Sequence, residues 1–194
     1  IYSGSKGAAE LVFKSYYRSF FNQDGSNVKV ATSRAGNVVG GGDWAKDRIV
    51  PDCMCAWSKK EIVEIRSPNA TRPWQHVLEP LSGYLLLGQQ LYNGENINGE
   101  SFNFGPMSQH IHTVEDILKE MSKYWNINDF SKAYKITDDI KFHEAGLLKL
   151  NCDKALFHLK WLPTLNYEQL MRFTGFWYFN FYKNHLEFQQ PSNI

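Results

Sequence analysis

The stretch "GAAELVFKSYYRSFFNQDGSNVKVATS", residues 7–33, contains the change of pattern that decides the fold. Apolar residues recur at helical spacing across its first half, at Ala9, Val12, Tyr16 and Phe20. Asp24 and Gly25 then end this pattern, because this pair is typical of a turn. Residues 27–33 follow as a run that favours a strand. The stretch therefore predicts a helix, a turn and a strand in that order.

The rest of the chain repeats this alternation of helix and strand. Helical patterns cover residues 49–60, 76–93, 113–125 and 166–182, and strand patterns cover residues 61–65, 101–105, 132–136 and 147–151. Thr113 and Asp116 have the spacing of a capping box at a helix start. Alternating strands and helices predict an α/β fold.

Composition limits the classes of partner. Lysine plus arginine number 21 against 20 aspartate plus glutamate, so the charge balance argues against a nucleic-acid partner. No apolar run has the roughly 20 residues that cross a bilayer, which argues against a membrane protein. The three cysteines, Cys53, Cys55 and Cys152, suit reduced thiols better than disulfides or a zinc site. We therefore expect a cytoplasmic protein that binds small ligands or protein partners.

Tyr2 and Lys6 form the first candidate site, a Tyr-x-x-x-Lys pattern at a helix start. At this spacing the lysine ammonium can lie near the phenol oxygen. A free phenol has a pKa of about 10, and a base near pH 7 needs a pKa lower by roughly 3 units, which a nearby cation can supply. On the pattern alone, an exposed pair without a role remains the alternative.

Two loops contain further candidates. In residues 33–52, Arg34 and Asn37 end a predicted strand, where ligands gather in parallel α/β sheets, and Arg48 precedes a helix. Arg66 and Arg72 flank a loop after another strand, and guanidinium groups suit phosphate oxygens. An ordinary flexible loop and ordinary surface arginines are the alternatives.

Three other patterns argue against particular functions. His110 and His112 have the spacing of a metal pair on a strand, but no third ligand is evident, so we expect no metal. The aromatic run 173–182 lacks interleaved basic residues, so it favours a helix packed on several sides over a base-stacking surface. No glycine-rich phosphate loop of the G-x-G-x-x-G type occurs, so the main site for a dinucleotide is not in these residues.

Five segments together carry a resemblance to a known family. They are "YSGSK" (2–6), "SRAGNVVGGGDWAKDRIVPD" (33–52), "RSPNATRPWQHVLEPLSGYL" (66–85), "FNFGP" (102–106) and "HEAGLLKLNCDKA" (143–155). The chain resembles the later two-thirds of the extended short-chain dehydrogenases/reductases of the NAD-dependent epimerase/dehydratase family, and within it the CDP-glucose 4,6-dehydratases. Most relatives of other specificity have Arg-Asp-aromatic where this chain has Arg72-Pro73-Trp74.

The resemblance implies a role for each matching residue. Tyr2 would be the base at the sugar 4-hydroxyl, and Lys6 would hold the nicotinamide ribose of NAD. Ala35 and Gly36 would line the nicotinamide. The substrate CDP-glucose would be bound by Asn37, Arg48, Ile49, Arg66, Arg72, Lys141 and Glu144. Lys141 stands where relatives often have an arginine.

The resemblance also implies a domain division and an incomplete Rossmann-type doubly wound sheet. Residues 1–36 would be the catalytic helix and a late strand of the NAD-binding domain, and residues 37–194 would be mainly the smaller substrate-binding α/β domain, with about 76–105 returning to the first. We expect a piece of a longer protein that is inactive alone and forms a homodimer when complete. An epimerase, a dehydratase for another nucleotide and a silent nucleotide-sugar-binding module are the alternatives.

Overall fold

The computed structural model describes residues 2–107, 112–137 and 148–184, and it divides into two compact units. Unit 1 comprises Ile1–Gly36, Leu78–Met107 and Leu150–Thr164, and unit 2 comprises Asn37–Val77, Ser108–Lys149 and Leu165–Ile194. Both units combine helices with strands, and three of the four strand pairs in the described part are parallel. The predicted α/β class is therefore confirmed.

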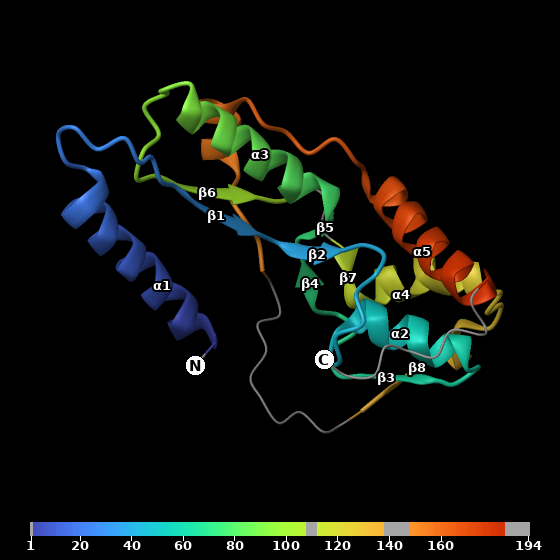
Figure 1. The fold of residues 1–194 in the computed structure, drawn as a ribbon. Helices are drawn as coiled ribbons and strands as arrows, with labels where there is room; N and C mark the ends of the chain where they lie inside the picture. The colour runs from blue at the N-terminus through green and yellow to red at the C-terminus, as the bar shows by residue number, and fades with distance from the viewer. Residues whose placement is uncertain (1, 108–111, 138–147, 185–194) are drawn as a thin grey trace. The chain divides into compact units, whose positions relative to one another are not determined.

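Unit 1 is built on one parallel pair of strands covered by helices (Figure 1). Its elements are α1 (Tyr2–Tyr16), the π-helical turn η1 (Tyr17–Phe21), β1 (Thr32–Ala35), α3 (Leu78–Tyr92), β6 (Ser101–Phe104) and the π-helical turn η4 (Ala155–Leu159). β1 pairs with β6 in a register that runs from Thr32 opposite Ser101 to Ala35 opposite Phe104.

The core of unit 1 forms around Phe104, which is fully buried on β6. Gly83 of α3 lies against its ring so closely that a Cβ at residue 83 would be 2.2 Å from a ring carbon. Trp161 stands edge-on to the same ring at 5.0 Å, and its indole N–H donates to the Ser82 hydroxyl at 3.0 Å. These contacts fix α3 on the strand pair.

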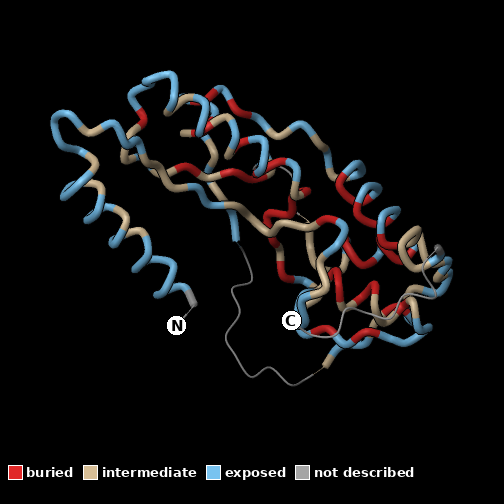
Figure 2. The backbone as a smooth tube through the Cα atoms, in the orientation of Figure 1, coloured by how far each residue is buried: buried red, intermediate tan, exposed pale blue. Residues whose placement is uncertain are grey.

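The first helix confirms its predicted type, although most of its apolar row is exposed. α1 ends at Tyr16 and continues as η1 to Phe21, and the side chains of Phe13, Tyr17 and Phe21 are half-buried. Three residues of the apolar row are exposed: Val12 (56%), Tyr16 (56%) and Phe20 (62%). Figure 2 shows this helix as mainly exposed with half-buried positions at intervals.

Unit 2 contains three short strand pairs and three α-helices among its described residues. Its elements are β2 (Asn37–Val39), α2 (Ile49–Ser58), β3 (Val63–Ile65), β4 (Thr71–Arg72), β5 (Trp74–His76), β7 (His112–Thr113), α4 (Val114–Ser122), η2 (Lys123–Trp125), η3 (Phe130–Lys132), β8 (Tyr134–Ile136) and α5 (Tyr167–Asn184). β2 runs parallel to β5, β3 runs parallel to β8, and β4 runs antiparallel to β7.

The core of unit 2 lies among α2, α4 and α5. Met54, Ile117 and Tyr178 are fully buried in it, one from each helix. Trp57 closes the end of α2, since its indole N–H donates to the Ala133 carbonyl at 2.8 Å. The predicted capping box is confirmed: the backbone N–H of Asp116 donates to the Thr113 hydroxyl at 3.1 Å, and the backbone N–H of Thr113 donates to the Asp116 carboxylate at 2.8 Å.

Two predictions were wrong. Residues 148–151 form no strand, although their apolar pattern favoured one, because a strand needs a partner and no pairing reaches them. The aromatic helix α5 is not packed on several sides. It buries Leu170, Thr174 and Tyr178 along one face, whereas Phe176 is 60% exposed.

Candidate functional site

The candidate residues of unit 1 lie on α1 and at the end of β1. α1 begins at Tyr2, so the helix places Tyr2 and Lys6 about one turn apart. Lys6 is exposed. Ala35 is the last residue of β1, and the backbone N–H of the following Gly36 donates to the Phe104 carbonyl at 3.2 Å. Gly36 therefore continues the parallel pairing at the carboxyl end of β1, where parallel sheets bind ligands.

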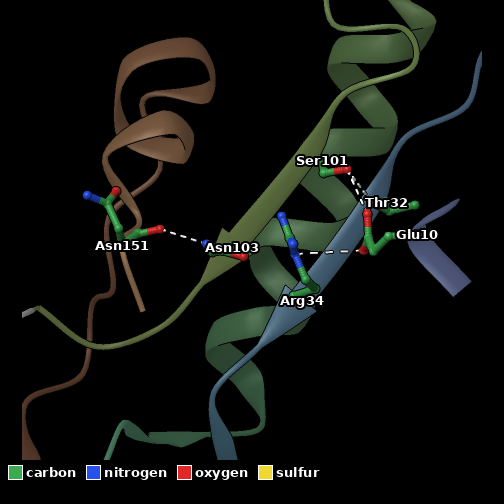
Figure 3. Close-up of polar contacts among 6 residues, drawn as sticks. All are labelled: Glu10, Thr32, Arg34, Ser101, Asn103 and Asn151. Carbon is green, nitrogen blue, oxygen red and sulfur yellow. Dashed lines mark hydrogen bonds and ion pairs between the residues drawn. The ribbon is translucent and has the colours of Figure 1, made fainter. Parts of the chain in front are cut away.

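Glu10 fastens the helix that carries Tyr2 and Lys6 to this strand pair (Figure 3). Its carboxylate accepts hydrogen bonds from the Thr32 hydroxyl at 3.2 Å and from the Ser101 hydroxyl at 3.0 Å. The Arg34 guanidinium lies 3.8 Å from the same carboxylate. Sequence reasoning missed Glu10. The available signal was its position one further helical turn after Lys6.

Asn37 and Arg72 lie close together in unit 2. Asn37 begins β2, and its backbone N–H donates to the carbonyl of Pro73, the residue after Arg72, at 3.0 Å. Arg72 is only 9% exposed, and its Nη1 donates to the Thr71 carbonyl at 2.8 Å. Because little solvent screens this guanidinium, it attracts an anion that reaches it more strongly than an exposed arginine would.

Arg48 and Ile49 stand at the start of α2. Arg48 is the N-cap residue of the helix, and its Nη1 forms an ion pair with the Asp43 carboxylate at 3.0 Å. The Arg48 side chain is 62% exposed. Ile49 is the first helical residue, and its side chain packs against the core of unit 2. Arg48 therefore projects beside a helix N-terminus, where unpaired backbone N–H groups favour anions.

Of the remaining predicted substrate residues, one lies in the described part of the chain and two do not. Arg66 is exposed and directly follows β3. Lys141 and Glu144 lie outside the described residues. The structure thus brings together Asn37 with Arg72 in unit 2, and it places Lys6, Ala35 and Gly36 in unit 1.

Neither the histidines nor the cysteines form a metal-binding cluster in the described ranges. Within residues 2–107, 112–137 and 148–184, no group of three or more His, Cys, Asp or Glu side chains is arranged to hold a metal. His112 stacks on the ring of Tyr167, with ring centres 3.5 Å apart, and His110 lies outside those ranges. Cys53, Cys55 and Cys152 are not joined in disulfides, and burial raises the pKa of Cys53 well above its usual range.

Among the helices that the structure describes, none combines the length and the apolar character needed to traverse a lipid bilayer.

Comparisons with known proteins identify the relatives of the chain. No protein-family model matches it. It is 46% identical over 165 residues to CDP-glucose 4,6-dehydratase of Salmonella typhimurium, a match that covers 84% of this chain and 45% of that protein. The chain therefore spans about half the length of the curated relative that it matches.

Solved structures show which fold the chain shares. dTDP-glucose 4,6-dehydratase from Bacillus anthracis, solved in complex with NAD, matches with a TM-score of 0.74 and 19% identity, over 95% of this chain and 53% of that one. UDP-glucuronic acid 4-epimerase from Bacillus cereus, solved with UDP-glucuronic acid and NAD, matches with a TM-score of 0.76 and 16% identity, over 91% of this chain and 52% of that one. These structures confirm a partial Rossmann-type fold.

The identity and the shared fold agree with the resemblance first indicated by the Tyr-x-x-x-Lys helix and the Arg72-Pro73-Trp74 segment. The chain is a homologue of CDP-glucose 4,6-dehydratase, and it shares the fold of NAD-dependent dehydratases and epimerases of nucleotide sugars.

Proposed function

We propose that the protein containing this chain is a sugar-nucleotide 4,6-dehydratase that converts CDP-D-glucose to CDP-4-keto-6-deoxy-D-glucose. The observation that carries the proposal is the 46% identity to a CDP-glucose 4,6-dehydratase over 165 of the 194 residues. The segment Arg72-Pro73-Trp74, which differs from the Arg-Asp-aromatic pattern of most relatives, favours this nucleotide over the others.

NAD is the proposed cofactor, and part of unit 1 suits one end of it. Gly36 has no side chain and lies at the carboxyl end of a parallel strand, the edge at which such sheets bind cofactors. The exposed ammonium of Lys6 can donate hydrogen bonds to ribose hydroxyls. When bound, NAD takes up the hydride from sugar C4 and returns it at C6, so the reaction has no net redox change.

The proton transfer at the sugar 4-hydroxyl is assigned to residues of α1, whereas the acid/base groups of the elimination step are not named by these residues. Tyr2, as phenolate, removes the proton of the sugar 4-hydroxyl while the C4 hydride leaves, which gives a 4-ketone. Lys6 lowers the pKa of this phenol because a nearby cation favours the charged form. The ketone makes the C5 proton acidic, and loss of that proton with the C6 hydroxyl releases water and leaves a C5–C6 double bond. Return of the hydride at C6 would be accompanied by addition of one proton at C5, which balances the proton taken from the 4-hydroxyl.

The substrate is proposed to be held by residues of unit 2. Arg48 and Arg72 neutralise the diphosphate, and Asn37 donates a hydrogen bond to it. Arg66 lies against the cytosine, and Ile49 contacts the nucleotide. Lys141 and Glu144 complete the site on the diphosphate and the ribose. We propose accordingly that unit 1 belongs to the cofactor domain and unit 2 to the substrate domain.

Turnover of three nucleotide sugars tests the proposed function. The whole gene product containing these residues is incubated with CDP-glucose, dTDP-glucose or UDP-glucose, and loss of one water from the sugar is followed by mass spectrometry. We expect dehydration of CDP-glucose at the highest kcat/KM. Faster dehydration of another substrate, or inversion at C4 without loss of water, would replace this proposal with a sister dehydratase or an epimerase. Binding of CDP-glucose without any reaction would favour a silent binding module.

A homodimer in the cytoplasm is the proposed state of the protein. The exposed apolar row Leu11, Val12, Tyr16 and Phe20 on α1 is a suitable self-association surface. The three cysteines, which form no disulfides, suit a reducing compartment. Sedimentation of the wild type and of Val12→Glu tests the dimer, since a charge in that row should shift the protein towards the monomer.

A further inference from the structure

The loop between β2 and α2 carries Arg48 and begins with three consecutive glycines, Gly40, Gly41 and Gly42. Gly42 has φ +81°, and Asp47 also has a positive φ of 64°. Consecutive glycines give a chain more conformational freedom than any other residues. The position of Arg48 therefore depends on contacts that the loop makes with other elements.

Tyr178 of α5 holds the middle of this loop. Its hydroxyl donates to the Asp43 carbonyl at 2.8 Å and accepts from the Asp43 backbone N–H at 3.2 Å. Tyr178 is fully buried, and burial raises the pKa of its phenol, so the hydroxyl stays protonated and remains a donor. Both backbone polar groups of one loop residue are thus fixed by one side chain 135 residues later.

A second contact with α5 restrains the glycines themselves. A Cβ placed on Gly41 would lie 2.1 Å from the Trp177 indole, so backbone and ring are in close contact. Trp44, the residue after Asp43, stands edge-on to Tyr178 at 5.4 Å and lies 4.8 Å from the ring of Phe181. The loop is therefore held by aromatic packing on both sides of Asp43.

The Asp43 side chain transmits this restraint to Arg48. One carboxylate oxygen pairs with Arg48 Nη1 at 3.0 Å, and the other accepts from the Ala45 backbone N–H at 3.0 Å. A guanidinium has five N–H donors, and this ion pair uses one of them. Arg48 can thus be oriented by Asp43 while most of its donors remain available for phosphate oxygens.

We propose that α5 positions Arg48 for the substrate diphosphate through Tyr178 and Asp43, so that Tyr178 is a positioning residue for nucleotide-sugar binding. This inference rests on the role proposed above for Arg48. It predicts that a buried hydroxyl on the C-terminal helix controls substrate affinity and leaves the hydride and proton steps unchanged.

A double-mutant cycle between Tyr178→Phe and Arg48→Ala tests the inference in the whole gene product. Tyr178→Phe removes both hydrogen bonds to Asp43, and we expect it to raise the Kd for CDP-glucose about three- to tenfold, as loss of one or two hydrogen bonds does. The KM should rise with it, while kcat and the NAD content of the purified protein stay at the wild-type level. In the Arg48→Ala background, Tyr178→Phe should have no further effect on Kd.

Tyr182→Phe is the matched control. It removes a hydroxyl, one turn later on the same helix, that makes no hydrogen bond to Asp43, and it keeps the ring that lies edge-on to Trp44 at 5.7 Å. Its Kd should equal that of the wild type. Gly41→Ala provides a second test if Tyr178→Phe fails to fold, because it displaces the loop from Trp177 without changing α5, and it should raise Kd in the same direction.

Three outcomes would overturn the inference. The first is that Tyr178→Phe and Gly41→Ala each raise the Kd for CDP-glucose by the same factor in the Arg48→Ala background as in the wild type. Another is a Kd for both variants that matches the control. A third is a wild-type Kd for Arg48→Ala in a protein that still dehydrates CDP-glucose, which would remove the role of Arg48 and leave the proposed function intact. Absence of both CDP-glucose binding and turnover in the wild type would instead refute the proposed function.

Discussion

The carboxylate of Glu10 accepts a hydrogen bond from the Ser101 hydroxyl at 3.0 Å, which joins α1 to β6 across 91 residues of sequence. The Thr32 hydroxyl donates to the same carboxylate, so two strands hold one side chain of the helix. We expect Glu10→Ala to lower the free energy of unfolding by about 1–3 kcal/mol, because the half-buried hydroxyls of Thr32 and Ser101 lose their acceptor. Urea unfolding measures this change. Amide exchange along α1 should also accelerate, since the helix loses an anchor.

Lys14→Ala is the control for Glu10, because Lys14 is an exposed residue one turn later on the same helix. It should leave both the unfolding free energy and the exchange rates close to the wild type. Unchanged exchange in α1 of Glu10→Ala would show that the carboxylate does not anchor the helix.

Two glycines of α3 form a matched pair for testing helix packing. A Cβ at Gly83 would lie 2.2 Å from the Phe104 ring, whereas nothing lies within 4 Å of a Cβ at Gly88. Gly83→Ala should therefore destabilise the protein by about 1–3 kcal/mol through overpacking. Gly88→Ala should stabilise it by up to about 1 kcal/mol, since alanine has the higher helix propensity. Thermal unfolding of the two variants measures both changes. Equal shifts in their unfolding temperatures would contradict the close approach of Gly83 to the Phe104 ring.

The capping box of α4 should make stability depend on pH. Hydrogen bonds from Thr113 lower the pKa of Asp116 below its ordinary value. A carboxyl with a lowered folded-state pKa stabilises the fold above its unfolded pKa, and this contribution is lost as the pH falls through the folded value. The advantage of the wild type over Asp116→Asn should therefore shrink as the pH falls below about 4. The urea unfolding midpoints of both proteins at several pH values measure this change. A stability difference between wild type and Asp116→Asn that stays constant with pH would rule out a contribution from the Asp116 titration.

Removal of the Thr113 hydroxyl tests the other half of the capping box. Thr113→Ala should cost about 1 kcal/mol of unfolding free energy, because the Asp116 backbone N–H loses its acceptor at the first turn. Lys119→Ala, an exposed position of the same helix, is the control and should change stability little. Equal unfolding midpoints for Thr113→Ala and this control would show that the cap contributes nothing.

The proposed base gives a prediction about turnover. Tyr2→Phe in the whole gene product should reduce kcat at least about 100-fold, because general-base catalysis contributes that much or more. Binding of CDP-glucose should be retained, since the diphosphate contacts are untouched. Tyr16→Phe removes an exposed phenol from the same helix and should leave kcat unchanged. Wild-type turnover in Tyr2→Phe would refute the role of Tyr2.

Local signals in the sequence were sufficient for most helices. The start of α4 was predicted correctly because a capping box involves residues only three apart. Residues 148–151 were wrongly predicted as a strand because pairing depends on a distant partner that their own pattern cannot reveal. The apolar spacing of α1 marked the helix but not its buried side, since Val12 and Tyr16 are exposed while Glu10 is half-buried.

The candidate site was predictable only where a motif marked it. Tyr2 with Lys6 and Arg72 before Pro73-Trp74 could be found from the family pattern. Glu10 and Tyr178 could not, because each acts through hydrogen bonds to residues far along the chain. Their importance depends on tertiary contacts rather than on any spacing in the sequence.

The strand pairings determine the order in which this chain can fold. Among the described strands, none pairs with its immediate neighbour in sequence, and Thr32 meets Ser101 across 69 residues. Closing long loops costs entropy before any ladder bond is gained, so helices complete early and sheets form late, on a timescale of roughly milliseconds to seconds. During synthesis, the pairing of β1 with β6 cannot form until β6 leaves the ribosome. Until then, the backbone groups of β1 that bond to β6 have no ladder partner, and unpaired strand edges of this kind favour aggregation.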